Sequence, residues 1–261
     1  MVQLEQIQSF FPEYVRDNPA HRKYMIKEYI QLMILDYLSS VPYIRKMTFI
    51  GGTSLRLVKG IDRFSEDLDF DCKQLSEQEF TLMAESVVSF LQRSGLRAEI
   101  REKASDKLKA FRKNIYFPEL LFELGLSGHR EERFLIKIES QDQGIDYLPI
   151  PVSVKGCGFF FPISVPPDDV LCAMKISALL SRRKGRDFYD AMFLLALTPP
   201  NYEYLNQKRN IRNWSELKEA LLKILEQEDL KKKSQDFEHL LFRGNSAKIL
   251  LFGDFIENYG L

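Results

Sequence analysis

The chain has 261 residues, of which 45% are hydrophobic and 28% charged, and its 37 basic residues balance its 37 acidic ones. This composition is ordinary for a globular protein and provides material for one large domain or two modest ones. Because the net charge is zero, the overall charge of the protein does not attract nucleic acid or membranes. Any such partner has to be bound by local charged patches.

Two further properties concern the compartment. The longest apolar run, residues 191–197, is far too short to span a bilayer, and residues 1–17 lack the basic-then-apolar pattern of a signal peptide. We therefore expect a cytoplasmic protein with no membrane partner. Cys72, Cys157 and Cys172 form no close-spaced pair, which favours reduced structural thiols over a zinc site or a disulfide.

The first elements of the chain are predicted to be helices. A short helix is expected over residues 3–17 and a longer one from Asn18 to about residue 39, because Asn18 and Pro19 are typical of a helix start. Apolar residues recur at helical spacing in the longer helix and predict a buried packing face.

The segment 48–72 carries the strongest functional signal. A short apolar strand leads into Gly51-Gly52-Thr53-Ser54 and a helical turn. Two glycines let the backbone approach a ligand closely and adopt positive φ, while a helix start offers free N–H groups to an anion. The pattern indicates a phosphate-binding turn, with a ligand-free strand-to-helix turn as the alternative. Thr53 and Ser54 either donate hydroxyls to phosphate or cap the helix.

The same segment continues with alternating acidic and apolar residues. If this stretch is a strand, Asp67, Asp69 and Asp71 share one face and the apolar residues between them pack on the core. Neighbouring carboxylates repel each other unless a divalent cation lies between them, and oxygen ligands suit Mg²⁺. Arg63 and Ser65 lie just before these acids, and Arg63 either holds a phosphate or pairs with a neighbouring acid.

The middle of the chain is predicted to form a sheet. Ser76 caps a helix that ends at Gly95, and four probable strands follow at residues 96–101, 111–117, 134–139 and 147–154. Together with the two strands of the segment 48–72 they predict a small mixed β-sheet covered by helices, an α+β or α/β nucleotide-handling core.

The remainder is predicted to be helical. Helices are expected over residues 170–181, 187–197 and 214–227 and in segments within 235–258. A domain boundary near residue 165 then gives a core domain, 1–165, and a helical C-terminal domain, 166–261. Lys175 lies among apolar residues, where burying its charge is costly unless it reaches a cleft or a counter-charge.

Four motifs occur in a fixed order: Gly51-Gly52-Thr53-Ser54, then Arg63-x-Ser65-x-Asp67-x-Asp69-Phe70, then Lys175, then Arg186-Asp187-x-x-Asp190. This order resembles the AbiEii/AbiGii toxin family, which belongs to the polymerase-β-like nucleotidyltransferases. The resemblance implies a nucleoside triphosphate as substrate and Mg²⁺, as two ions, held by Asp67 and Asp69. It implies transfer of a nucleoside monophosphate to an acceptor with loss of pyrophosphate.

A third carboxylate usually completes such a site. The strand 134–139 offers Glu139 as this metal ligand and catalytic group, with Lys137 on the same face to reach a phosphate. Asp142 and Asp146 remain alternatives. Glu139 and Lys137 could also pair with each other on a solvated strand.

The resemblance also assigns roles in the helical part. Lys175 is expected to reach the triphosphate or the base. Independently of the resemblance, Arg182 belongs to a basic turn that either attracts phosphates or is only solvated. Asp187 and Asp190 lie near the start of the next helix, where the helix dipole favours anions. They are expected to orient the neighbouring basic groups rather than to bind a metal.

By family resemblance alone the acceptor is the 3′ end of a tRNA and the partner is a cognate antitoxin of a type IV toxin–antitoxin or phage-abortive-infection system. An RNA end requires basic and aromatic side chains. The candidates are Arg97, Arg101, Lys107, Lys109, Phe111, Arg112, Lys113 and Tyr116. A small-molecule nucleotidyltransferase of the aminoglycoside type and a nucleotide-binding regulator without turnover are the alternatives.

Overall fold

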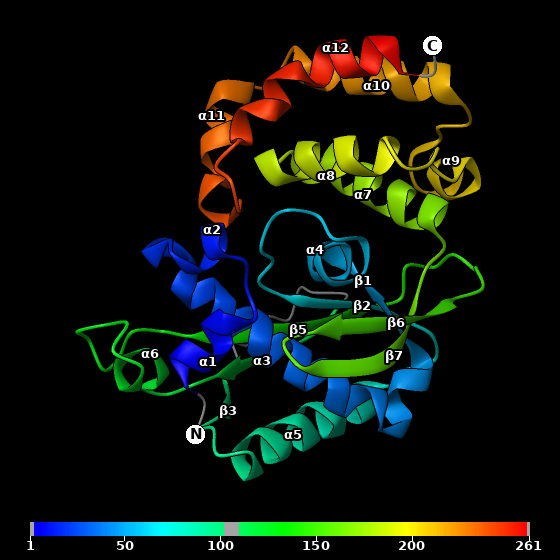
Figure 1. Cartoon of the computed structure of the whole chain (residues 1–261). Helices are drawn as coiled ribbons and strands as arrows, with labels where there is room; N and C mark the ends of the chain where they lie inside the picture. Colours follow the sequence, from blue (N-terminus) through cyan, green and yellow to red (C-terminus); the bar gives the residue numbers. More distant parts are fainter. Residues whose placement is uncertain (1–2, 102–109, 260–261) are drawn as a thin grey trace. The chain divides into compact units, whose positions relative to one another are not determined.

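The computed structural model describes residues 3–101 and 110–259 of the chain (Figure 1). These residues divide into two compact units, one of residues 3–101, 110–144 and 149–165 and one of residues 145–148 and 166–259. Helices surround a mixed sheet in the first unit and the second unit is helical, so the predicted α+β class is confirmed. Among the described helices, none has the length and apolar character needed to cross a membrane.

The first unit contains a five-stranded sheet. Its strands are β1 (Met47–Ile50), β2 (Leu68–Cys72), β3 (Glu99–Arg101), β4 (Phe111–Tyr116) and β5 (Leu135–Gln141). They lie in the order β1-β2-β5-β4-β3, with β2 parallel to β5 and the other pairs antiparallel. A parallel pair needs a long crossover, and the chain between β2 and β5 supplies it.

The last predicted strand was assigned to the wrong sheet. β6 (Ile150–Gly156) pairs only with β7 (Phe159–Val165), a strand the sequence did not predict, and together they form a separate two-stranded sheet. The cause is local, because Cys157 and Gly158 close a two-residue hairpin with φ of 48° and 84°. Such turns require positive φ, and a cysteine in the sequence does not indicate a turn of this kind.

The N-terminal prediction needs a second correction. The single helix expected over residues 3–17 is in fact two short helices, α1 (Leu4–Ser9) and α2 (Glu13–Arg16). Pro12 interrupts the helix, because it has an extended backbone conformation and is the N-cap residue of α2. Asn18 caps a 3₁₀ turn rather than the long helix, accepting a hydrogen bond from the Ala20 N–H.

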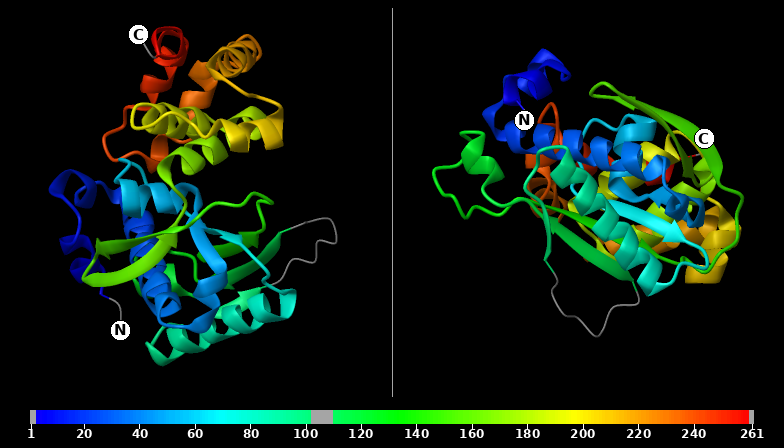
Figure 2. Two further views of the ribbon diagram at one scale, coloured as in Figure 1. Left: turned by 90° about the vertical axis from the view of Figure 1, so that its right-hand side faces the viewer. Right: turned by 90° about the horizontal axis from the view of Figure 1, so that it is seen from below.

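Helices cover the sheet of the first unit on both sides. α5 (Glu77–Arg93) packs against β3 and β4, and α4 (Gly51–Ser54) packs against β2 and continues into a π-helical turn, η3 (Leu55–Lys59). α5 and α4 lie on opposite faces of the sheet in both side views (Figures 1 and 2). The apolar residues of β2 therefore face a covered core while its acidic residues point the other way.

The helix α3 (Arg22–Ser39) is buried around most of its circumference. Its buried residues include the polar residues Lys27, Glu28 and Gln31, whereas Tyr24 and Tyr29 are only half-buried. Burial of polar side chains requires partners. Those partners lie in the segment that leads to the acidic strand, as described below.

The second unit consists of helices. They are α7 (Asp168–Arg182), α8 (Gly185–Leu195), α9 (Tyr202–Arg209), α10 (Trp214–Leu225), α11 (Leu230–Gln235) and α12 (Phe252–Asn258), with short 3₁₀ turns between α11 and α12. α7 packs against α8 and α9, and α11 packs against α8. α9 was not predicted, since its sequence is mostly polar.

Candidate active site

The acidic residues of β2 lie beside the basic and acidic residues of β5. The parallel register places Asp69 next to Glu139, and Asp67 comes directly before β2. The antiparallel register then places Glu139 next to Arg112 and Lys137 next to Asn114 on β4. One face of the sheet thus carries a row of charged side chains, as the alternation in β2 predicted.

Lys137 makes ion pairs with two of these carboxylates. Its Nζ lies 2.9 Å from Asp67 Oδ2 and 3.5 Å from Glu139 Oε2. Burial lowers the pKa of Lys137, but attraction to Asp67, Glu139 and Asp69 outweighs burial and raises the pKa above its ordinary value. The ammonium therefore stays charged among the three carboxylates.

Arg112 holds Glu139 from the other side. Its Nε lies 2.8 Å and a terminal nitrogen 2.7 Å from Glu139 Oε2. A guanidinium with two nitrogens close to one carboxylate oxygen gives a strong, well-oriented pair. The predicted third carboxylate is therefore engaged by two basic side chains, and the sequence had assigned Arg112 to RNA instead.

The glycine turn and the acidic strand meet in space. Gly51 has a φ of 83°, and a Cβ added to it would overlap Asp69 Oδ2 and lie 2.8 Å from Asp69 Cβ. Gly51 therefore has the positive φ predicted for this turn. The absence of a side chain at this position is what lets the carboxylate of Asp69 lie against the backbone.

Gly52 lies over a buried arginine. A Cβ on Gly52 would be 2.6 Å from Ser65 Oγ and 3.0 Å from a terminal nitrogen of Arg63. The Arg63 side chain is 1% exposed, and it donates a 2.9 Å hydrogen bond to the carbonyl oxygen of Phe64. In this position Arg63 supports the turn from below; the sequence left open whether its guanidinium holds a phosphate or pairs with a neighbouring acid.

The hydroxyls of Thr53 and Ser54 are likewise below the surface. Thr53 Oγ1 donates a hydrogen bond to the backbone carbonyl of Asp67, which ties α4 to the start of β2. Ser54 is fully buried, and its hydroxyl has no hydrogen-bond partner within the described part of the chain. Neither residue is exposed to solvent; the sequence left open whether these hydroxyls donate to a phosphate or cap the helix.

Polar residues of α3 position the loop before β2. Gln31 donates a 3.2 Å hydrogen bond from its side-chain amide to the carbonyl oxygen of Ser65, and Lys27 Nζ lies 3.2 Å from Glu66 Oε1. A buried hydrogen bond of this kind is costly to break, because the partner is left unsatisfied. Sequence reasoning missed these residues, since they fall within an otherwise apolar helix.

The remaining acidic residues have other partners. Asp71 is 2% exposed and accepts a 2.8 Å hydrogen bond from the Gln143 N–H. This contact anchors the loop after β5 and gives Asp71 a structural role. Asp142 forms an ion pair of 2.8 Å with Lys73 on the surface and accepts a hydrogen bond from the Gly144 N–H. Asp146 is exposed and belongs to the second unit.

The chemistry of the donors fits a divalent cation at Asp67 and Asp69. Both are partly exposed oxygen donors two positions apart, and the Lys137 ammonium is a cation already lying among the carboxylates. No group of three His, Cys, Asp or Glu side chains within residues 3–101 and 110–259 is arranged to hold a metal ion. Glu139 as a metal ligand therefore remains a prediction.

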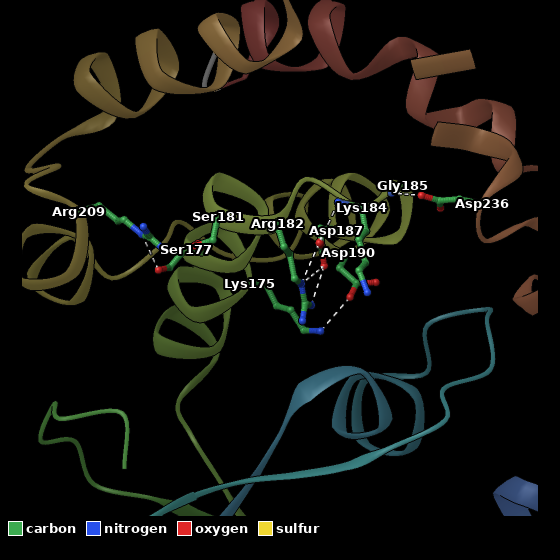
Figure 3. A network of polar contacts seen from close by, with 10 residues as sticks. All are labelled: Lys175, Ser177, Ser181, Arg182, Lys184, Gly185, Asp187, Asp190, Arg209 and Asp236. Atoms are coloured by element: carbon green, nitrogen blue, oxygen red, sulfur yellow. Dashed lines mark hydrogen bonds and ion pairs between the residues drawn. The ribbon is translucent and has the colours of Figure 1, made fainter. Parts of the chain in front are cut away.

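The second unit contains a buried ion pair. Lys175 Nζ on α7 lies 2.9 Å from Asp190 Oδ2 on α8, and both side chains are less than a tenth exposed (Figure 3). Asp190 is the counter-charge that the apolar surroundings of Lys175 require. A buried lysine of fixed position is typical of functional sites as well as of structural pairs.

Next to this pair, Arg182 and Asp187 are joined by several contacts of 2.7 to 3.1 Å. Asp187 is fully buried and also accepts a hydrogen bond from the Lys184 N–H at the start of α8. It therefore orients Arg182, one of the neighbouring basic groups.

Two further residues hold this arrangement and were not predicted. Arg209 on α9 donates hydrogen bonds to the Ser177 hydroxyl and carbonyl on α7 and to the Ser181 hydroxyl (Figure 3). Asp236 accepts a 3.0 Å hydrogen bond from the Gly185 N–H. Both contacts join residues about thirty to fifty positions apart, for which a single sequence provides no signal.

The described RNA candidates are largely neutralised. Arg97 pairs with Glu119 and Glu123, Arg101 with Glu99, and Arg112 with Glu139. Arg101 also lies over the Tyr116 ring at 3.6 Å. Lys113 and Phe111 are on β4, with Phe111 stacked on Phe80. Lys107 and Lys109 lie outside the described residues.

Comparisons with known proteins identify the family and the fold. The sequence model of the family described as "Nucleotidyl transferase AbiEii toxin, Type IV TA system" matches residues 34–248. The nucleotidyltransferase toxin MenT4 from Mycobacterium tuberculosis has a similar structure, with a TM-score of 0.61, 15% identity and coverage of 99% of this chain and 90% of that one. JHP933 from Helicobacter pylori gives a TM-score of 0.54 at 20% identity, covering 90% of each chain. A search of curated proteins gave no match.

Proposed function

The chain belongs to the AbiEii family of nucleotidyl transferase toxins of type IV toxin–antitoxin systems, and we propose that it transfers a nucleoside monophosphate from a nucleoside triphosphate to an acceptor in a Mg²⁺-dependent reaction. Membership of the family makes it a nucleotidyltransferase. The metal, the acceptor and the residue roles are the proposed part.

The observation that supports this proposal best is the contact of Asp69 with Gly51. An added Cβ on Gly51 would overlap the Asp69 carboxylate, so the turn and the acidic strand share one small region. A backbone without a side chain lets a phosphate approach closely, and the carboxylates attract the cation that accompanies it. A purely structural turn would not require an acidic strand at this distance.

Each residue then has a proposed task. Asp67 and Asp69 hold Mg²⁺, which when bound aligns the attacking and leaving oxygens and offsets their charge. Gly51 and Gly52 present backbone N–H groups to the triphosphate. Arg63 keeps the turn in position from below, because its guanidinium and the Ser65 hydroxyl lie directly under Gly52.

Lys175 is proposed to bind the nucleotide, in agreement with its place in the family motif. Its position is fixed by Asp190, and the Arg182–Asp187 pair fixes the start of the neighbouring helix. An ammonium held in one position by a buried partner loses little further freedom when it binds a phosphate. Asp187 and Asp190 act by positioning these basic groups.

The acceptor is proposed to be RNA, at the 3′ end of a tRNA, and the partner a cognate antitoxin. Both proposals rest on the family, since the described arginines near β4 are already paired with carboxylates. An RNA backbone would have to replace these partners, which makes its binding sensitive to salt.

One assay tests the proposal. The protein is incubated with each labelled nucleoside triphosphate, Mg²⁺ and either total tRNA or a panel of small molecules including aminoglycosides. Label in RNA supports the proposal, label in a small molecule supports the alternative acceptor, and binding without transfer supports a regulator. Asp69→Asn is expected to reduce transfer on the order of 100-fold. An Asp69→Asn variant with the wild-type rate would refute the proposed site.

A further inference from the structure

The acidic face of the sheet already contains a cation that belongs to the chain. Lys137 Nζ is within ion-pair distance of both Asp67 and Glu139, and these three side chains are only 23% to 30% exposed. A metal ion bridging Asp67 and Glu139 would have to take the place of this ammonium. Because the lysine is tethered to β5, it competes at a high effective concentration.

Glu139 is held by a second basic group as well. Arg112 and Lys137 both approach the same oxygen, Oε2, at 2.7 to 2.8 Å and 3.5 Å. A metal ion bound through this oxygen would have to displace a guanidinium with two close nitrogens in addition to the ammonium.

The charges on this face lead to the same conclusion. Within the cluster of Asp67, Asp69, Glu139, Lys137 and Arg112, three negative and two positive charges leave one negative charge. Asp71, on the same strand face, is a separate buried carboxylate that accepts a hydrogen bond from the Gln143 N–H. One divalent ion reverses the sign of the cluster and favours a triphosphate. A second divalent ion would add two more positive charges within a few ångströms of the two basic groups, where repulsion is strong.

We propose that Lys137 is the second cation of this site, so that the protein uses one divalent ion, held by Asp67 and Asp69, together with the Lys137 ammonium. The inference rests on the proposed function, which assigns the metal to these two aspartates. Lys137 is then a positioning residue that sets the number of bound metal ions, in place of the second metal expected from the sequence. Arg112 holds Glu139 in the same arrangement.

Metal stoichiometry tests this inference without an activity measurement. Mn²⁺ binding is counted by electron paramagnetic resonance, first without nucleotide and then with a non-hydrolysable nucleoside triphosphate analogue. Wild type is expected to bind one Mn²⁺ per chain with the analogue and Lys137→Met two. Without nucleotide, the Lys137→Met dissociation constant for Mn²⁺ is expected to fall about three-fold or more, because a competing charge is gone.

Two variants control for charge and folding. Lys137→Arg keeps a cation and should retain one Mn²⁺, whereas Lys155→Met removes an exposed lysine of β6 and should leave both values unchanged. Two ions on the wild type, or unchanged binding by a folded Lys137→Met, would overturn the inference while leaving the proposed function intact. Failure of the wild type to bind any Mn²⁺ would instead remove the proposed function. If Lys137→Met does not fold, the number of Mn²⁺ ions bound by the wild type still tests the inference.

Discussion

The carboxylate of Asp69 lies against Gly51, in the space that a side chain on Gly51 would otherwise fill. This contact joins the residue after β1 to the start of β2, and the two strands pair with Ile50 opposite Asp69. A phosphate-type turn and a metal-type carboxylate are thereby held by the same two hydrogen-bonded strands. The register of these two strands therefore sets the position of Asp69 relative to the turn.

Gly51→Ala is predicted to abolish transfer. The new methyl group would overlap Asp69, and the φ of 83° would cost a non-glycine residue about 1–2 kcal/mol. Gly60→Ala is the matched control, because Gly60 has a φ of 73° but nothing within 4 Å of its added Cβ. Both variants are compared by thermal unfolding and by nucleotidyl transfer. Equal activity of the two variants would show that the contact with Asp69 is unimportant.

The acidic strand is predicted to contain two kinds of aspartate. Asp71→Asn should lower stability by about 1–2 kcal/mol and keep transfer near the wild-type rate, because Asp71 accepts a hydrogen bond from Gln143 N–H in the loop after β5. Asp69→Asn should instead lower the transfer rate and leave the free energy of unfolding near that of the wild type. The pair of measurements, denaturant unfolding and transfer rate, separates a structural from a metal-binding carboxylate, and equal loss of activity in both would contradict the assignment.

Much of this site could be predicted from the sequence because its signals are local. The alternation of Asp67, Asp69 and Asp71 with apolar residues follows from the two-residue period of a strand, and the structure has that strand. Gly51 was expected at positive φ for an equally local reason. The sequence predicted a mixed sheet but not the order of its strands, because strand pairing depends on residues far apart in the chain.

The partners of the charged residues could not be predicted. Arg112 and Glu139 are 27 positions apart, and Gln31 reaches Ser65 across 34 positions. Nothing in the spacing of such residues indicates that they meet, because the register between β4 and β5 brings them together. For the same reason Arg63 looked like a surface residue, although packing under Gly52 buries it.

The buried pair of the second unit is predicted to be essential for stability. Asp190→Asn leaves the Lys175 ammonium, 6% exposed, without its counter-charge, and breaking a buried pair in this way typically costs about 3–5 kcal/mol. Arg212→Gln removes an exposed pair with Glu216 and should change stability little. Urea unfolding measures both, and similar small effects would show that Lys175 does not depend on Asp190.

The cysteines are predicted to react slowly with thiol reagents. Burial raises the pKa of Cys157 and of Cys172 to about 12, and burial also raises the pKa of Cys72. The thiolate is the reactive form, so at pH 8 nearly all of each thiol is protonated and inert. Labelling with a chromogenic disulfide should be slow in the native protein and complete after unfolding. Rapid labelling of one thiol at pH 8 would contradict this prediction.

The capping box of α5 is predicted to make stability depend on pH between about 4.5 and 2. Glu79 accepts hydrogen bonds from Lys46 Nζ at 2.6 Å and from the Ser76 N–H at 2.9 Å, and these contacts lower its pKa from 4.5 to about 2. A carboxyl group with a lowered pKa in the folded state stabilises it fully above the unfolded-state pKa. This contribution is lost as pH falls through the folded-state value.

Glu79→Gln should therefore lower the melting temperature at pH 7 and have less effect at pH 2, where the wild-type carboxyl group is itself becoming protonated. Glu77→Gln is the matched control, because Glu77 lies in the same first turn of α5. The measurement is the difference in melting temperature between each variant and wild type from pH 2 to pH 7. A Glu79→Gln difference that stays constant over this range would show that the contacts with Lys46 and Ser76 do not hold the carboxylate in its charged form.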